Sequence, residues 1–139
     1  MSDRELMALA VKARENAYAP YSDFRVGAAL LTESGRVYMG CNIENAAYTP
    51  TNCAERTAFF KAVSEGERRF CAIAVTGGKG EMTSELCAPC GVCRQVMAEF
   101  CSPDFRVILG NAEQTRSVTL EELLPLSFSP ADLREDNDQ

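Results

Sequence analysis

Apolar residues near the amino terminus recur at helical spacing. Ser2 and Glu5 have the form of a capping box, in which a hydroxyl and an acid three residues later bind free backbone amides. The apolar positions behind them are separated by three or four residues: Leu6, Leu9, Ala10, Ala13 and Ala17. This pattern predicts a helix that runs to about Tyr18 and is stopped by Pro20.

Two short apolar runs follow, with a polar turn between them. Residues 26–31 and 37–41 are mainly apolar, and the turn between them contains Gly35. This arrangement predicts a β-hairpin. The next stretch, 42–52, is rich in Asn, Ala and Thr and contains Pro50, which predicts a loop.

Helices and strands alternate along the remaining chain. The runs 70–75 and 105–109 are almost continuously apolar, which is typical of strands buried on both faces. Gly77, Gly78 and Gly80 predict a flexible loop directly after the first of these strands. The other expected elements are helices over 53–63, 90–100 and 120–124 and a strand over 115–118.

This order of elements predicts an α/β protein with helices covering both faces of a sheet. The 139 residues, of which 46% are hydrophobic, suit a single domain that spans residues 1–139. The residues from about 134 onward are polar, and we expect this tail not to pack.

The charge of the chain argues against two classes of partner. A formal net charge of −6 gives no overall attraction to phosphate backbones or anionic lipids, so we expect no nucleic-acid and no membrane partner. Charged residues interrupt the first ten positions, and no window approaches the roughly 20 apolar residues of a membrane span. We therefore expect a cytoplasmic protein with reduced thiols.

Three of the seven cysteines have the spacing of a catalytic zinc site. Cys90 and Cys93 lie at positions i and i+3 of an expected helix, so their sulfurs face the same way. Cys53, which opens another expected helix, can supply a third sulfur. Three protein ligands leave one corner of a tetrahedral zinc free, and water would occupy that corner.

An acid lies next to this ligand set. Zinc lowers the pKa of bound water from about 15.7 to about 7, and Glu55 is the candidate for moving the proton. Cys53 and Glu55 are two positions apart, so on a helix their side chains would point about 200° apart. We therefore expect the metal beyond the amino-terminal end of the helix, where both side chains can lean toward it. Three thiolates leave a formal negative charge on the site, and Arg56 and Gln95 are the candidate partners of the ligand sulfurs.

A different class of protein is an alternative. Cys87, Cys90 and Cys93 could join Cys53 in a closed four-cysteine site, as in a non-enzymatic zinc-binding or redox-sensing module. In such a module Glu55 would have no role. Pro89 marks a helix start that leaves Cys87 in the preceding loop.

The motifs resemble those of a known family. Cys53-Ala54-Glu55 and Pro89-Cys90-Gly91-Val92-Cys93 match the signature of zinc deaminases, in which the acid is not a metal ligand. Four further segments closely resemble the small, homotetrameric, zinc-dependent members of the cytidine and deoxycytidylate deaminase superfamily: Tyr18-Ala19-Pro20-Tyr21-Ser22, Val26-Gly27-Ala28-Ala29-Leu30, Gly40-Cys41-Asn42-Ile43-Glu44-Asn45-Ala46-Ala47-Tyr48 and Cys93-Arg94-Gln95.

The resemblance implies a three-layer α-β-α sandwich with a five-stranded mixed sheet and one Zn²⁺ per subunit. It implies hydrolysis of cytidine and 2'-deoxycytidine to uridine and 2'-deoxyuridine, with release of ammonia, in pyrimidine salvage. A deaminase for another cytosine compound is disfavoured by the segment from Asn42 to Tyr48, and one for polynucleotides by the acidic chain.

The resemblance also assigns substrate contacts. Asn42 and Glu44 would bind the ribose hydroxyls, and Phe24 would pack on the nucleoside. Ala54 and Glu55 would bind the pyrimidine edge. In a homotetramer, neighbouring subunits would complete each pocket with three further residues: Ala46, Tyr48 and Phe128.

Overall fold

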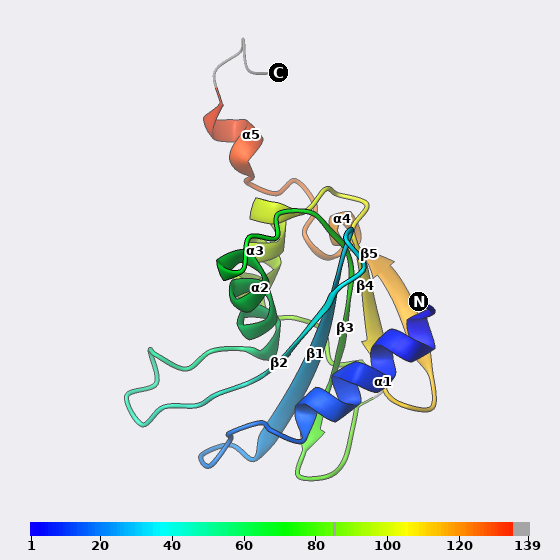
Figure 1. The fold of residues 1–139 in the computed structure, drawn as a ribbon. Helices are drawn as coiled ribbons and strands as arrows, with labels where there is room; N and C mark the ends of the chain where they lie inside the picture. Colours follow the sequence, from blue (N-terminus) through cyan, green and yellow to red (C-terminus); the bar gives the residue numbers. More distant parts are fainter. Residues whose placement is uncertain (85, 135–139) are drawn as a thin grey trace.

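A five-stranded mixed sheet forms the centre of the computed structural model, which describes residues 1–84 and 86–134 (Figure 1). The strand order is β2-β1-β3-β4-β5. Its β3–β4 pair is parallel, and its other pairs are antiparallel. The strands are β1 (Phe24–Thr32), β2 (Val37–Cys41), β3 (Phe70–Lys79), β4 (Arg106–Gly110) and β5 (Thr115–Thr119).

Helices cover both faces of this sheet (Figure 1). Helix α1 (Asp3–Arg14) packs on one face, and α2 (Ala54–Ser64) and α3 (Gly91–Phe100) lie on the other. The short helices α4 (Leu120–Leu123) and α5 (Pro130–Leu133) follow the last strand. The predicted α-β-α layering with a five-stranded mixed sheet is therefore confirmed.

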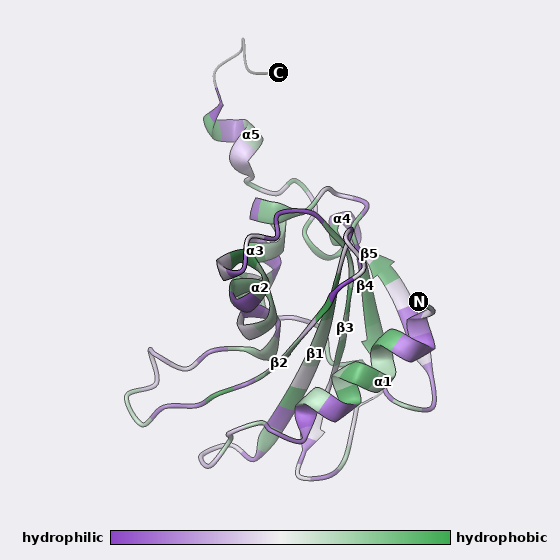
Figure 2. Ribbon diagram, in the orientation of Figure 1, coloured by the Kyte–Doolittle hydropathy of each residue, from purple (hydrophilic) through white to green (hydrophobic). Residues whose placement is uncertain are grey.

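The alternation of side chains in β3 builds two cores. Ala72 and Ala74 point toward α1, whereas Ile73 and Val75 point toward α2 and α3. Figure 2 shows the hydrophobic colour along the central strands, where these residues are fully buried. Because β3 is apolar on both faces, it reads in the sequence as a continuous apolar run.

Helix α1 ends four residues before the expected Tyr18. The Tyr18 amide donates to the Asn42 carbonyl at 2.9 Å, and the Glu44 amide donates to the Tyr18 carbonyl at 2.8 Å. These bonds tie the chain after α1 to the loop that follows β2. Pairing with a distant segment thus overrides the local helical pattern.

The prediction of a loop at Gly77 and Gly78 was wrong, because β3 continues to Lys79. Gly77 pairs with Val26, and Gly78 pairs with Arg25. A Cβ atom on Gly78 would lie 2.1 Å from the Met82 carbonyl oxygen, and such a contact is sterically forbidden. These glycines therefore permit close packing of the chain after β3, and only Gly80 turns with a positive φ.

One side chain fastens that following segment. The Arg14 guanidinium donates to the carbonyl oxygens of Arg25, Gly78, Gly80 and Met82 at 2.7–2.9 Å. The end of α1 is thereby linked to β1, to β3 and to the chain that leads to α3. Within the described residues, no helix combines the length and apolar character needed to cross a membrane. Residues 135–139 of the expected polar tail lie outside the described residues.

Candidate active site

Two helix starts bring three cysteine sulfurs together. Cys53 is the N-cap of α2, Cys90 is the N-cap of α3, and Cys93 lies in the first turn of α3. The Cys90 sulfur is 3.8 Å from that of Cys53 and 3.6 Å from that of Cys93, and all three lie within 4.8 Å of one another. Sulfurs at 2.3 Å from a tetrahedral zinc are about 3.8 Å apart, so this donor set fits the metal.

The helix ends also suit thiolates. The first backbone amides of a helix carry a partial positive charge, which stabilises a nearby anion. Neither Cys53 nor Cys90 caps its helix with a side-chain hydrogen bond. Their sulfurs therefore remain available to a metal.

Arg56 contacts this cluster, whereas Gln95 does not. The Arg56 Nη2 atom donates to the Cys53 sulfur at 3.2 Å. The pKa of Cys53 is lowered to about 5, first by a hydrogen bond from Cys93 and also by Arg56, against the opposing effect of burial. Gln95 instead donates to the Phe128 carbonyl at 2.7 Å. It lies two residues after Cys93 on the same helix, so its side chain points about 200° away from that of Cys93.

Glu55 is a buried acid beside the sulfurs. Only 4% of its surface is exposed, and burial is the main cause that raises its pKa to about 7. The negative charge of Cys53 raises the pKa further. A carboxyl group with a pKa near neutrality can both accept and donate a proton.

A pocket of about 250 Å³ adjoins the cluster. Of the residues expected at the site from the sequence, Phe24, Asn42, Glu44, Ala54 and Glu55 line it, together with Cys53 and Cys90. The other lining residues were not expected at the pocket from the sequence, and Cys87 was considered only as a possible fourth metal ligand. They are Ser22, Val26, Thr51, Asn52, Cys87 and Ala88. The available signals were the position of Ser22 within the Tyr18–Ser22 motif and that of Val26 at the start of the Val26–Leu30 motif.

Asn42 and Glu44 are held by the backbone around them. Asn42 accepts from the Val26 amide at 2.9 Å and donates to the Phe24 carbonyl at 2.7 Å. Glu44 accepts hydrogen bonds from the Tyr21 and Ser22 amides and from the Ser22 hydroxyl. The Ser22 hydroxyl is the main cause that lowers the pKa of Glu44 below its ordinary value.

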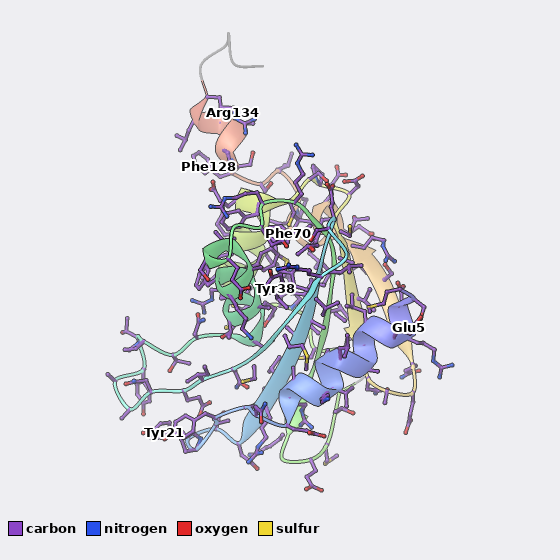
Figure 3. All side chains as sticks on the ribbon, viewed as in Figure 1. Glu5, Tyr21, Tyr38, Phe70, Phe128 and Arg134 are labelled. Atoms are coloured by element: carbon purple, nitrogen blue, oxygen red, sulfur yellow. The ribbon has the colours of Figure 1, made fainter. Side chains whose placement is uncertain are left out.

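Three expected contacts lie outside this pocket. Ala46 and Tyr48 belong to the long loop after β2, where Tyr48 is 76% exposed. Phe128 is 58% exposed and lies near α5, away from Tyr21 and the loops at the opposite end of the molecule (Figure 3). Within one chain, none of the three lines the pocket that adjoins the cysteine cluster.

Cys87 also stays outside the cluster of three sulfurs. It forms part of the pocket wall, and burial raises the pKa of its thiol to about 11. A Cβ atom on Gly77 would lie 2.7 Å from the Cys87 sulfur, so the glycine makes room for it. The described arrangement therefore has three clustered cysteines rather than a closed set of four.

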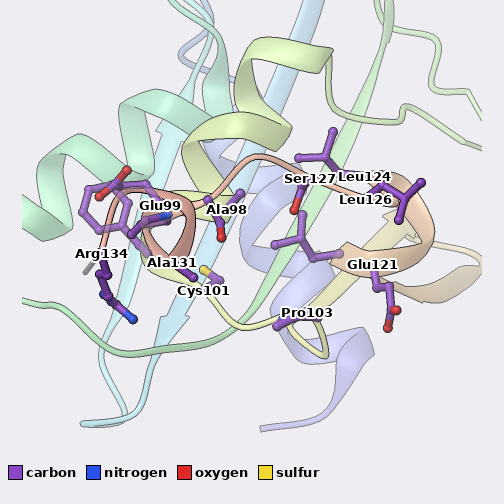
Figure 4. Close-up of a pocket in the computed structure, with 14 residues that line it drawn as sticks. Ala98, Glu99, Cys101, Pro103, Glu121, Leu124, Leu126, Ser127, Ala131 and Arg134 are labelled. Carbon is purple, nitrogen blue, oxygen red and sulfur yellow. The ribbon is translucent and has the colours of Figure 1, made fainter. Parts of the chain in front are cut away.

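A larger cavity lies elsewhere. It measures about 600 Å³ and is bounded by α3, α4 and the carboxyl-terminal segment (Figure 4). Glu99, Cys101 and Arg134 are among its lining residues, and none of the clustered cysteines is. The chemistry-bearing groups thus occupy the smaller pocket.

Comparison with known proteins agrees with this geometry. Residues 1–109 match the family model described as "Cytidine and deoxycytidylate deaminase zinc-binding region". The chain belongs to this deaminase family. The matched region includes all three clustered cysteines and Glu55.

Individual relatives are similar over nearly the full length. A cytidine deaminase of Sporosarcina psychrophila is 54% identical, with 96% of each chain covered. A cytidine deaminase of Halalkalibacterium halodurans is 52% identical, with 97% of this chain and 100% of the relative covered. The crystal structure of cytidine deaminase from Burkholderia pseudomallei superimposes with a TM-score of 0.85 at 50% identity, covering 92% of this chain and 100% of the other. The family member described here is a hydrolytic deaminase.

Proposed function

We propose that this enzyme hydrolyses cytidine and 2'-deoxycytidine to uridine and 2'-deoxyuridine with release of ammonia. The observation that carries the proposal is the buried Glu55 beside three sulfurs that are spaced for a tetrahedral metal. The names of the two relatives described above support the choice of a cytosine nucleoside. The reaction would serve pyrimidine salvage in the cytoplasm.

Cys53, Cys90 and Cys93 would hold one Zn²⁺ per subunit, which supplies a water activated at neutral pH. Arg56 would stabilise the ligand thiolates through its hydrogen bond to Cys53. Such a partner offsets the formal negative charge that three thiolates leave on a divalent ion.

Glu55 would carry the proton transfers. It accepts a proton from the attacking water and donates it to ring nitrogen N3, and later takes the proton of the new C4 hydroxyl and delivers it to the departing amine. The C4–N bond breaks, and the water oxygen remains on C4. The pKa of Glu55, near 7, suits a group that must take up and release protons at neutral pH.

The pocket walls would bind the nucleoside. Phe24 would pack on it, and Ala54 would contact the pyrimidine edge beside Glu55. Asn42 would donate a hydrogen bond to the ribose hydroxyls, and Glu44 would accept one from them. An uncharged nucleoside suits this pocket, whose acidic groups are Glu44 and Glu55 among the described lining residues.

A homotetramer would complete the pocket. Ala46 and Tyr48 would come from one neighbouring subunit, and Phe128 would come from another. All three side chains are exposed in the single chain, which leaves them accessible to a neighbouring subunit.

The decisive test measures the ultraviolet absorbance of cytidine and the zinc content of the protein together. We expect the cytidine absorbance band to disappear in the presence of protein that carries about one zinc per subunit. Bound zinc without turnover would instead support the non-enzymatic zinc or redox-sensing module.

Glu55→Gln tests the mechanism within the same assay. We expect zinc content to stay unchanged and turnover to fall by about 100- to 10,000-fold, the usual range for losing a general acid–base group. Glu65→Gln, an exposed residue at the end of the same helix, is the matched control. Normal turnover in Glu55→Gln would remove Glu55 from the mechanism.

A further inference from the structure

The Glu44 carboxylate is held from one side. Its Oε1 atom accepts from the Tyr21 amide at 2.9 Å and from the Ser22 amide at 3.2 Å. Its Oε2 atom accepts a short hydrogen bond from the Ser22 hydroxyl. All three donors belong to the turn between α1 and β1, so the carboxylate is fixed at this turn.

These bonds leave little acceptor capacity. An ionised carboxylate offers about four lone-pair positions, and Glu44 uses three of them within the protein. The remaining position is on Oε2, and the residue lines the pocket. Glu44 can therefore accept one further hydrogen bond from a ligand, which is enough for a single hydroxyl group.

The Ser22 hydroxyl has a second bond. While it donates to Glu44, it accepts from the Phe24 amide at 3.0 Å. Asp23, between Ser22 and Phe24, has a φ of 57°, which lies in the left-handed region that residues other than glycine seldom adopt. One hydroxyl thus links two pocket-lining residues, Glu44 and Phe24, across a locally strained backbone.

We propose that Ser22 is a positioning residue for substrate binding: its hydroxyl fixes the Glu44 carboxylate so that one acceptor position faces one sugar hydroxyl. This inference rests on the proposed nucleoside substrate. Ser22 acts through Glu44, so its removal weakens nucleoside binding and leaves the chemical step at the cysteine cluster intact.

The kinetic test uses Ser22→Ala, Ser22→Thr and the control Ser64→Ala. Ser64 is exposed at the end of α2, where its hydroxyl bonds to the Lys61 carbonyl. For cytidine, we expect Ser22→Ala to raise KM about tenfold, the size of one hydrogen bond to a charged group, with kcat within about twofold. Ser22→Thr keeps the hydroxyl and should restore most of the binding, and Ser64→Ala should match the wild-type protein.

The hydroxyl-specific readout compares cytidine with its 2'-deoxy, 3'-deoxy and 5'-deoxy analogues. We expect the Ser22→Ala effect on KM to vanish for one analogue, the one that lacks the hydroxyl bound by Glu44. A merely structural role would raise KM equally for all four compounds, and that result would overturn the proposal. A loss of kcat with unchanged KM would overturn it as well.

A second measurement does not depend on turnover. Carbon-13 NMR of the Glu44 side chain should show a pKa below the ordinary value in the wild-type protein and a higher pKa in Ser22→Ala. An unchanged Glu44 pKa in Ser22→Ala would show that Ser22 does not hold the carboxylate. If wild-type protein turned over no cytidine, the proposed substrate would fail, while this titration would still decide the role of Ser22.

Discussion

The two ends of the pocket are built in different ways. At the metal end, defined by Cys53, Glu55, Cys90 and Cys93, the groups are attached to two helices, and Glu55 and Cys93 are almost fully buried. At the hydroxyl end, defined by Ser22, Asn42 and Glu44, the groups lie on turns and loops that are held by hydrogen bonds. The sulfurs and the acid are thus preorganised by the core of one chain, whereas the proposed recognition groups lie on surface turns and loops.

The two ends also differ in how much of each is supplied by a single chain. The metal end has its three sulfurs and its acid within one chain. Beyond the hydroxyl end, the long loop after β2 leaves Tyr48 exposed in the single chain. Changes at the metal end should therefore abolish function outright, while changes at the hydroxyl end and its neighbouring loop should act in a graded way.

The largest effect is expected from Cys90→Ser. Serine is a favoured N-cap residue, so α3 should persist while one metal ligand is lost. We expect zinc content to fall well below one per subunit and turnover to fall by at least about 1,000-fold. Metal analysis and the cytidine absorbance assay measure the two effects.

Two matched serine variants sharpen this result. Cys71→Ser, at an exposed position of β3, should leave zinc content and turnover unchanged. Cys87→Ser should retain one zinc per subunit, because Cys87 is outside the cluster. Loss of zinc from Cys87→Ser would favour the closed four-cysteine site.

A smaller effect concerns the acidity of the metal end. In metal-free protein, the pKa of Glu55 is about 7, above its ordinary value of 4.5, because the group is buried. The folded protein then holds the proton more tightly than the unfolded chain, so this contribution to stability is present below pH 4.5 and is lost as pH rises through 7. Relative to Glu55→Gln, the wild-type free energy of unfolding should fall by about 3 kcal/mol across that interval.

Urea unfolding with a chelator present, repeated across this pH range, measures the difference between the two proteins. A difference that does not change with pH would mean that Glu55 keeps its ordinary pKa. A difference that grows with rising pH would require a stabilised carboxylate, which is the opposite of the effect of burial.

Arg56→Gln should weaken the metal end without dismantling it. Loss of the hydrogen bond to the Cys53 sulfur should lower zinc affinity by about 10- to 100-fold, the range for groups that orient metal ligands. Competition with a chromophoric chelator measures this affinity. Arg69→Gln, an exposed arginine remote in sequence from the ligands, should leave it unchanged, and equal affinity in both variants would exclude Arg56 from the site.

The smallest effect is expected from Tyr48→Ala, which should raise KM about tenfold by removing a contact from a neighbouring subunit. Mixing this variant with Glu55→Gln under conditions that allow subunit exchange creates some pockets with both wild-type groups. At cytidine concentrations well below KM, random exchange should raise the activity of the mixture from about a twentieth to about a quarter of the wild-type value, since each pocket draws the two groups from different subunits. Activity equal to the simple average of the separate variants would rule out shared pockets.

Much of the fold could be predicted because local and distant signals agree. The capping box at Ser2 and Glu5 forms as expected, and the apolar runs over β3 and β4 are buried strands. The end of α1 could not be predicted, because the bonds from Tyr18 to the loop after β2 are distant in sequence. The prediction of a loop at Gly77 and Gly78 was wrong for the same reason. These glycines are needed because a Cβ atom would clash with the Cys87 sulfur or with the Met82 backbone, and neither contact is visible in the local sequence.

The site shows the same limit. The pairing of Cys90 with Cys93 could be predicted because spacing within one helical turn is local geometry. Cys53 and Glu55 belong to another helix start and were added through the deaminase motif. Ser22 was missed as a site residue, because its importance arises only when the turn before β1 meets Glu44. The orientation of Gln95 toward Phe128 likewise depends on how the carboxyl-terminal segment lies on α3.

The anchoring of the chain after β3 by Arg14 has a consequence for sequence divergence. Arg14 binds this segment at the Gly80 and Met82 carbonyls, groups that every amino acid carries. The side chains of residues 81–83 can therefore be exchanged widely, provided that the backbone path, Arg14 and the positive-φ glycine at position 80 are retained. Segments grafted here from other proteins should be accepted on the basis of length and shape rather than composition.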